Sequence, residues 1–153
     1  MRTIRVSIDG LNDAIREINR FASWIEERKK VLLKKLCDRG AEIAREECPV
    51  DTGDLQSSIQ SMIDDIAGMV VATSGHAAYV EFGTGVVGSG SPHPTMPWAY
   101  DVNAHGFDGW WYMKNDELHW TAGMPSRPFM YNTARRLAEE APQIAREVFS
   151  EQY

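Results

Sequence analysis

The stretch Ala77-Ala78-Tyr79-Val80-Glu81-Phe82-Gly83-Thr84-Gly85 is the most regular short segment of this 153-residue chain. Its apolar residues alternate with Tyr79 and Glu81, as the two-residue period of a pleated strand requires. Glycines then end the run. The pattern predicts a β-strand over residues 77–83, which leads into a glycine-rich opening.

Two further strands are predicted just upstream, over residues 55–63 and 66–73. Both runs are rich in β-branched and apolar residues, and Asp64-Asp65 lies between them as the tip of a hairpin. The strand at 77–83 would be the third strand of this meander. Residues 3–8 also alternate and predict a half-buried strand near the N-terminus.

Two helices are predicted outside this sheet. From Leu11 to about Glu47 the apolar residues recur every three or four positions, and Pro49 fixes the end of that helix. A C-terminal helix follows Pro128, bent or restarted at Pro142. The predicted fold class is therefore α+β: a small antiparallel sheet with a long N-terminal helix packed on it, plus a C-terminal helix, in one domain spanning residues 1–153.

Composition limits the classes of function. The formal net charge of -6 argues against a protein that works by gripping DNA. No apolar run approaches the roughly 20 residues that span a bilayer, so we expect no membrane partner and a cytosolic location. Cys37 and Cys48 lie eleven residues apart in one predicted helix, about 16 Å along its axis, and are expected to be free thiols.

Residues 49–55 read as a structured turn. Asp51 and Thr52 can bond neighbouring backbone N–H groups, and Gly53 can adopt the positive φ that reverses the chain. An Asp-Thr-Gly triplet also occurs in aspartic proteases, but their chemistry needs a second carboxylate of the same kind, and the chain has no second triplet.

Residues 84–124 form an extended excursion rich in glycine, proline and aromatic residues. A small hairpin is predicted inside it, with strands at 110–113 and 118–121 joined across Asn115-Asp116. Two interpretations of its aromatic residues stay open: a private mini-core, or a surface completed by another chain, where Trp and Tyr are enriched. The candidate interface residues are Trp98, Trp110, Trp111, Tyr112 and Trp120.

The sequence offers little support for catalysis. We expect that the protein is not an enzyme and that it binds no cofactor and no metal. None of the four histidines is paired at a spacing typical of metal ligands. Glu81 is expected to accept hydrogen bonds from loop backbone or to pair with Arg127. One alternative function is a small metal-dependent hydrolase that uses Glu81 with His76 or His105. The other is a nucleic-acid-binding domain using the basic face from Arg28 to Lys35, although nearby acidic residues favour a solvated helix face there.

Three motifs in this order carry a family resemblance. A long helix ending in PVDTGDL (49–55), the stretch AYVEFGT (78–84), and PSRPF (125–129) opening the last helix together resemble the gene-product-ten-like family of lambdoid tailed phages. The chain differs from the usual pattern in the length of its segment between Gly85 and Met124. The structural residues of the motifs are Pro49, Asp51, Thr52, Gly53, Leu55, Tyr79, Glu81, Phe82, Gly83, Thr84, Arg127, Pro128 and Phe129.

The resemblance implies a minor virion protein for head-to-tail joining, the neck or tail completion, from a phage or a prophage. It implies a ring-shaped homo-oligomer, for which six subunits is one candidate number, because head-to-tail contacts that close by rotation form rings. Its implied neighbours are head-completion and tail-terminator or tail-tube proteins, with DNA passing through the lumen without specific binding. The implied location is the virion, and the host bacterial cytoplasm during assembly.

Overall fold

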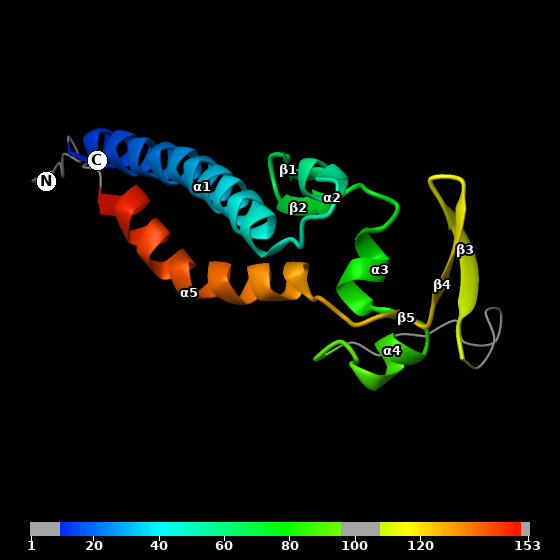
Figure 1. Cartoon of the computed structure of the whole chain (residues 1–153). Coiled ribbons are helices and arrows are strands. Elements are labelled where there is room, and N and C mark those ends of the chain that lie inside the picture. Colours follow the sequence, from blue (N-terminus) through cyan, green and yellow to red (C-terminus); the bar gives the residue numbers. More distant parts are fainter. Residues whose placement is uncertain (1–9, 96–107, 151–153) are drawn as a thin grey trace, which may run out of the picture.

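Two long helices form the body of the protein. In the computed structural model, which describes residues 10–95 and 108–150, α1 (Leu11–Glu47) and α5 (Phe129–Ser150) run side by side in opposite directions (Figure 1). Both were predicted, and α5 continues through Pro142 as one helix. Paired charges join them: the Arg39 guanidinium lies 2.6 Å from Glu140, and Arg136 lies 2.7 Å from Glu47.

A β-hairpin packs on α1. Its strands are β1 (Ile59–Ile63) and β2 (Gly68–Ala72), antiparallel, with Ile59 opposite Ala72. The predicted tip is confirmed, because Asp64 accepts hydrogen bonds from the backbone N–H groups of Ile66 and Ala67 at 2.8 and 2.6 Å. The first predicted strand begins too early, since the short helix α2 (Asp54–Ser57) precedes β1.

Gly40 lets three elements approach one another. A Cβ at this position would lie 3.0 Å from Val70 of β2 and 3.2 Å from Leu137 of α5. Helix α1 runs through Gly40 without a break, so Cys37 and Cys48 stay apart as free, buried thiols, as predicted. The core therefore sits at the C-terminal end of α1, where helix, hairpin and α5 meet.

The predicted strand at 77–83 is wrong, because Ala77–Phe82 form the helix α3. The sheet on α1 has two strands, and no meander forms. A run this short fits both the two-residue period of a strand and the 3.6-residue period of a helix. In the helix, Ala77 and Val80 lie three residues apart and both pack against the core. Alanines at its start also favour a helix. Tertiary packing thus overrides the alternating pattern.

The described part of the excursion holds a second hairpin and two other short elements. Helix α4 (Gly85–Gly90) follows α3, and strands β3 (Trp110–Lys114) and β4 (Glu117–Thr121) pair antiparallel before β5 (Gly123–Met124). The predicted hairpin is confirmed: Asn115 and Asp116 have φ of 55° and 62°, as a type I′ turn requires. It stands at the end of the molecule away from the start of α1 (Figure 1).

The predicted fold class, α+β, is confirmed, with a second small antiparallel sheet that the prediction placed in the excursion. The strand expected at residues 3–8 lies outside the described residues, as does Trp98. Among the described helices, none combines the length and apolar character needed to cross a membrane.

Candidate functional site

The three sequence motifs meet around Phe129, the residue with which α5 begins. Phe129 is 1% exposed and belongs to a core cluster with Cys48 and Ile59. Leu55 of the first motif and Val80 of the second pack against the same cluster. Segments separated by about 75 residues in the chain therefore share one core, which we call the motif junction.

Glu81 is the polar centre of the motif junction. Its side chain is buried, and its carboxylate accepts hydrogen bonds from the backbone N–H groups of Met130 (2.9 Å) and Tyr131 (3.0 Å). These N–H groups belong to the first turn of α5, where no intrahelical acceptor exists. A negative charge there also interacts favourably with the helix dipole. Glu81 thus fixes where α5 starts relative to α3.

His93 completes the environment of Glu81. Its Nε2 lies 3.1 Å from Glu81 Oε1, and its Nδ1 accepts a hydrogen bond from the Thr95 N–H at 3.3 Å. With Nδ1 acting as acceptor, Nε2 carries the proton and donates to the carboxylate. The ring packs between Phe82 (4.9 Å between centroids) and Tyr131 (5.5 Å). Sequence reasoning missed this role, because no spacing pattern links His93 to Glu81.

Arg127 contributes through its backbone and not through its side chain. Its N–H donates to the carbonyl oxygen of Val80 at 2.8 Å, while the hydroxyl of Ser126 donates to the carbonyl oxygen of Glu81 at 2.6 Å. Of the two roles expected for Glu81, hydrogen bonding to backbone is found and the ion pair with Arg127 is wrong, because the carboxylate is met by N–H groups of α5 and by His93. The second and third motifs bond directly to each other.

Gly83 permits this close approach. Its φ is +81°, and a Cβ there would lie 2.7 Å from the backbone nitrogen of Ser126. The next residue, Thr84, pairs with Met124 in an isolated β-bridge and accepts a hydrogen bond from the Met124 N–H at 3.2 Å. Tyr79 points outward from α3 and is half exposed. The glycine is thus required by both conformation and space.

The first motif turns as predicted at Gly53, whose φ is +87°. Thr52 is tied to the next helix, because its hydroxyl donates to the Asp54 carboxylate at 2.8 Å. Asp51 lies 3.7 Å from the Lys114 ammonium group of the second hairpin, an exposed ion pair. The turn of the first motif therefore also contacts the excursion.

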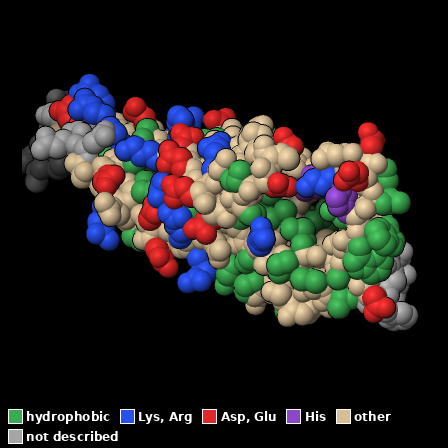
Figure 2. Space-filling view, viewed as in Figure 1, with side chains coloured by type: hydrophobic (Ala, Val, Ile, Leu, Met, Phe, Trp, Pro, Cys, Tyr) green, Lys and Arg blue, Asp and Glu red, His purple; other side chains and the backbone are tan. Residues whose placement is uncertain are grey.

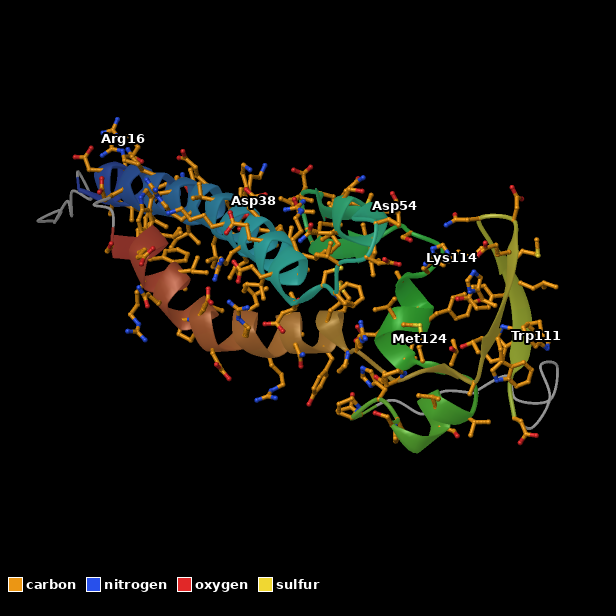
Figure 3. The ribbon with its side chains drawn as sticks, viewed as in Figure 1. Arg16, Asp38, Asp54, Trp111, Lys114 and Met124 are labelled. Carbon is orange, nitrogen blue, oxygen red and sulfur yellow. The ribbon has the colours of Figure 1, made fainter. Side chains whose placement is uncertain are left out.

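The β3–β4 hairpin has two unlike faces. Lys114 points back toward the body, whereas Trp111 lies on the far side (Figure 3). Trp110, on the face shared with Lys114, lies against Gly85. Cross-strand partners share a face, so the far face carries only apolar residues, all exposed. We call these four residues the outer face: Trp111, Met113, Leu118 and Trp120.

Hydrophobic side chains gather at this end of the molecule, while charged side chains dominate the helical end (Figure 2). The two indoles of the outer face contact each other edge to face, with 5.5 Å between ring centroids. Of the candidate interface residues, Trp111 and Trp120 are exposed on the outer face, while Tyr112 lies on the opposite face beside His119. Trp110 is half-buried.

The structure gives the two alternative functions little support. Within residues 10–95 and 108–150, no group of three His, Cys, Asp or Glu side chains could hold a metal ion. His76 is exposed at the start of α3, the histidine beside Glu81 is His93, and His105 lies outside the described residues. On the basic face, lysines pair with acidic side chains at 2.6 to 3.4 Å: Lys29–Glu26, Lys30–Asp65 and Lys34–Asp38.

Comparison with known protein families identifies one match. Residues 12–83 match the family model HK97-gp10_like, described as "Bacteriophage HK97-gp10, putative tail-component". The match includes α1, the β1–β2 hairpin and α3, with the first motif and the second as far as Gly83, and it confirms the predicted resemblance to gene-product-ten-like phage proteins. No curated protein and no solved structure matches the chain.

Proposed function

We propose, because residues 12–83 match the HK97 gp10-like family, that the chain acts at the junction between phage head and tail. There, copies of the chain would assemble into a ring between head-completion and tail-terminator or tail-tube proteins. The match to a family described as a putative tail component is the observation that carries this proposal, since a tail component is a structural protein of the virion.

Exposed apolar surface supports a role in assembly. Eighteen large hydrophobic side chains among the described residues are exposed, and many lie on the two hairpins and the first turns of α1. Aromatic residues and methionine are enriched at protein interfaces, and contiguous apolar patches on a protein surface mark interaction sites. A protein that joins other proteins needs such surfaces.

The motif junction supports a structural role for Glu81. Both carboxylate oxygens accept hydrogen bonds from groups of the same chain, and the side chain is 7% exposed. A general base must lie within hydrogen-bond reach of the proton it removes from a substrate. We therefore propose that Glu81 positions α5 and that the chain works without catalysis.

Charge supports a collar through which DNA slides. The chain carries a formal net charge of -6, and Lys29, Lys30 and Lys34 of the basic face are paired with acidic side chains. Unpaired cations facing DNA would hold it in a salt-dependent manner. Weak, salt-insensitive retention of DNA by the assembled protein is expected, whereas tight binding at low salt would contradict this part of the proposal.

Inactivation of the gene in its phage tests the function. Electron microscopy of the lysate should show filled heads and separate tails, and wild-type protein supplied in trans should restore joined particles. Glu139→Ala, which changes an exposed residue of α5, is the matched control and should also restore them. Joined, infectious particles formed without the gene, or purified virions that lack the protein, would refute the proposal.

A further inference from the structure

We propose that the free edge of strand β2 binds residues 3–8 of a second copy of the chain as a third strand. This inference rests on the proposed assembly role and names a contact through which copies join. Three observations carry it: the outward backbone groups of β2, the alternating pattern of residues 3–8, and the length of chain that separates the two segments.

The backbone groups on one edge of β2 have no partner among the described residues. The Thr73 N–H donates to the Ser58 carbonyl oxygen at 3.3 Å, and bonded pairs recur at every second position of an antiparallel ladder. Val71 therefore bonds to β1, whereas the N–H and C=O groups of Val70 and Ala72 point away from it. An edge of this kind is the template to which extended peptides add.

The outer edge of β1 is covered in a way that the edge of β2 is not. The carbonyl oxygen of Ile59 accepts a hydrogen bond from the Arg45 guanidinium at 2.7 Å. A charged side chain over a strand edge is one means by which proteins block further pairing. Within residues 10–95 and 108–150, no side chain bonds to the backbone of β2 in this manner. An added strand would therefore pair with β2.

The free edge of β2 borders an apolar groove. This groove, of about 490 Å³, lies against β2, α3 and the start of α5. Val70 and Ala72 are half-buried there, and backbone groups that are buried without a partner are costly. A neighbouring strand would bond to these groups and place alternate side chains over the apolar wall. The residues of this wall are Val70, Ala72, Ala77, Phe82, Phe129 and Met130.

Residues 3–8 have the pattern that this edge requires. Ile4, Val6 and Ile8 alternate with Arg5 and Ser7, so the segment in extended form has one apolar side and one polar side. The apolar side can cover the groove while the polar side faces water. Six extended residues span about 20 Å, enough to pair with the whole of β2. A strand also needs a neighbour for its own backbone groups, so the two segments complement each other.

Chain length places this contact between two copies. Val70 lies against Gly40, which is about 44 Å from Leu11 along the axis of α1. Ile8 precedes Leu11 by only three residues, and three extended residues span about 10 Å. Residues 3–8 therefore cannot reach β2 of their own chain. A contact between two different segments of identical chains is heterologous, and such contacts can close a ring.

A synthetic peptide of residues 2–9 tests the edge. Added in excess to dilute full-length protein, it should slow hydrogen exchange at the Val70 and Ala72 amides about 10-fold or more, measured by nuclear magnetic resonance. The amides of Met69 and Val71 are the matched control, because they already bond to β1 and should not change. Unchanged exchange at Val70 and Ala72, or protection only elsewhere in the protein, would overturn the proposal.

N-methylated peptides test whether the contact is a strand. Neighbouring amides of an added strand point in opposite directions, one to β2 and the next to water. One peptide is methylated at the Arg5 amide and its matched control at the Val6 amide. One of the two should bind about 5-fold more weakly than the unmodified peptide, and the other about equally well. Equal affinities of the two methylated peptides would contradict strand addition.

Self-association tests the source of the strand. Concentrated wild-type protein should show slow exchange at Val70 and Ala72 without any peptide. Ile4→Asn with Val6→Asn removes the apolar side of the segment and should weaken self-association, measured by sedimentation velocity, about 100-fold. Arg5→Ser keeps the alternation and should leave self-association unchanged. A wild-type chain that binds the peptide but stays monomeric up to its solubility limit would overturn the second copy as the source.

The proposed function is read out separately. If Ile4→Asn with Val6→Asn abolishes self-association but the variant still restores joined particles in the phage, this contact alone is contradicted. Loss of the gene without any effect on joining would contradict the assembly role itself.

Discussion

Replacing Glu81 with alanine should destabilise the protein where its three motifs meet. The substitution removes the carboxylate that accepts hydrogen bonds from Met130 N–H, Tyr131 N–H and His93. It leaves the buried His93 and the partly buried N–H groups of Met130 and Tyr131 without this acceptor, at the point where α5 begins. Because α5 packs along α1, weakening the start of α5 should lower the free energy of unfolding of the whole protein.

The expected loss follows from the contacts. A hydrogen bond to a charged group contributes about 1.5–3 kcal/mol, and loss of a helix cap costs about 1 kcal/mol. The three bonds share one carboxylate and are not additive, and Met130 and Tyr131 are only half-buried, so water can satisfy part of the lost bonding. We expect Glu81→Ala to cost about 3–5 kcal/mol, because it leaves three donors without their acceptor, at about 1–3 kcal/mol for each donor left fully unsatisfied. Glu81→Gln keeps one acceptor oxygen and should cost about 1–3 kcal/mol.

Urea unfolding at pH 7, followed by far-ultraviolet circular dichroism, measures these differences. A drop of this size is a large share of the roughly 5–15 kcal/mol that stabilises a typical domain. The dependence of unfolding free energy on urea should not change, because the surface exposed on unfolding stays the same. The matched control is Glu139→Ala on the exposed side of α5, expected within about 0.5 kcal/mol of wild type.

The result that would refute this reasoning is a Glu81→Ala protein within about 1 kcal/mol of wild type. It would show that α5 is placed by apolar packing around Phe129 alone. Equal losses for the alanine and glutamine variants would show that the charge matters more than the number of acceptors.

Three further predictions concern the two glycine turns, the Arg39–Glu140 ion pair and the buried thiol of Cys37. Gly53 has φ +87° and ψ -5°, in the left-handed region, so Gly53→Ala should cost about 1–2 kcal/mol. Gly83 has φ +81° and ψ 173°, a region that is essentially restricted to glycine, and a Cβ there would meet backbone 2.7 Å away. Urea unfolding should therefore show a further loss of about 1–3 kcal/mol for Gly83→Ala, and equal losses for the two variants would contradict this reasoning. The hydrogen bond from Arg39 lowers the pKa of Glu140. The ion pair therefore stabilises the folded protein above the ordinary glutamate pKa of about 4.3, and this stabilisation is lost as pH falls through the lowered value. Glu140→Gln should flatten the dependence of unfolding free energy on pH in the acid range, and an unchanged dependence would contradict the pairing. Burial raises the pKa of the Cys37 thiol, so a thiol reagent should react slowly with native protein and quickly in urea, and fast native labelling would contradict its burial.

Local patterns predicted the elements that local chemistry determines. The apolar stripe from Leu11 and the proline at 49 define α1, and positive φ at Asn115 and Asp116 makes the second hairpin turn. Gly53 has the angle that its turn requires. In each case the deciding interactions lie within a few residues of one another, so the sequence contains them directly.

Long-range contacts explain what local patterns could not predict. Ala77–Phe82 are helical because Ala77 and Val80 pack against a core built by distant segments, and the backbone N–H groups that bond to Glu81 belong to residues 49 and 50 positions later. Arg127 contacts α3 through its backbone N–H, which donates to the carbonyl oxygen of Val80, and not through its charged side chain. His93 has no local marker at all, because its partner lies twelve residues earlier, on the other side of helix α4. A six-residue run that fits two periods cannot reveal these contacts.

The carboxylate of Glu81 also has a consequence for how the protein treats nucleic acid. The free N–H groups at the start of a helix are a natural binding place for phosphate, because they combine donors with the positive pole of the dipole. In α5 this place is already taken by an anion of the same chain. The start of α5 is thereby closed to a phosphate group, so this helix end is not available as a binding place for nucleic acid.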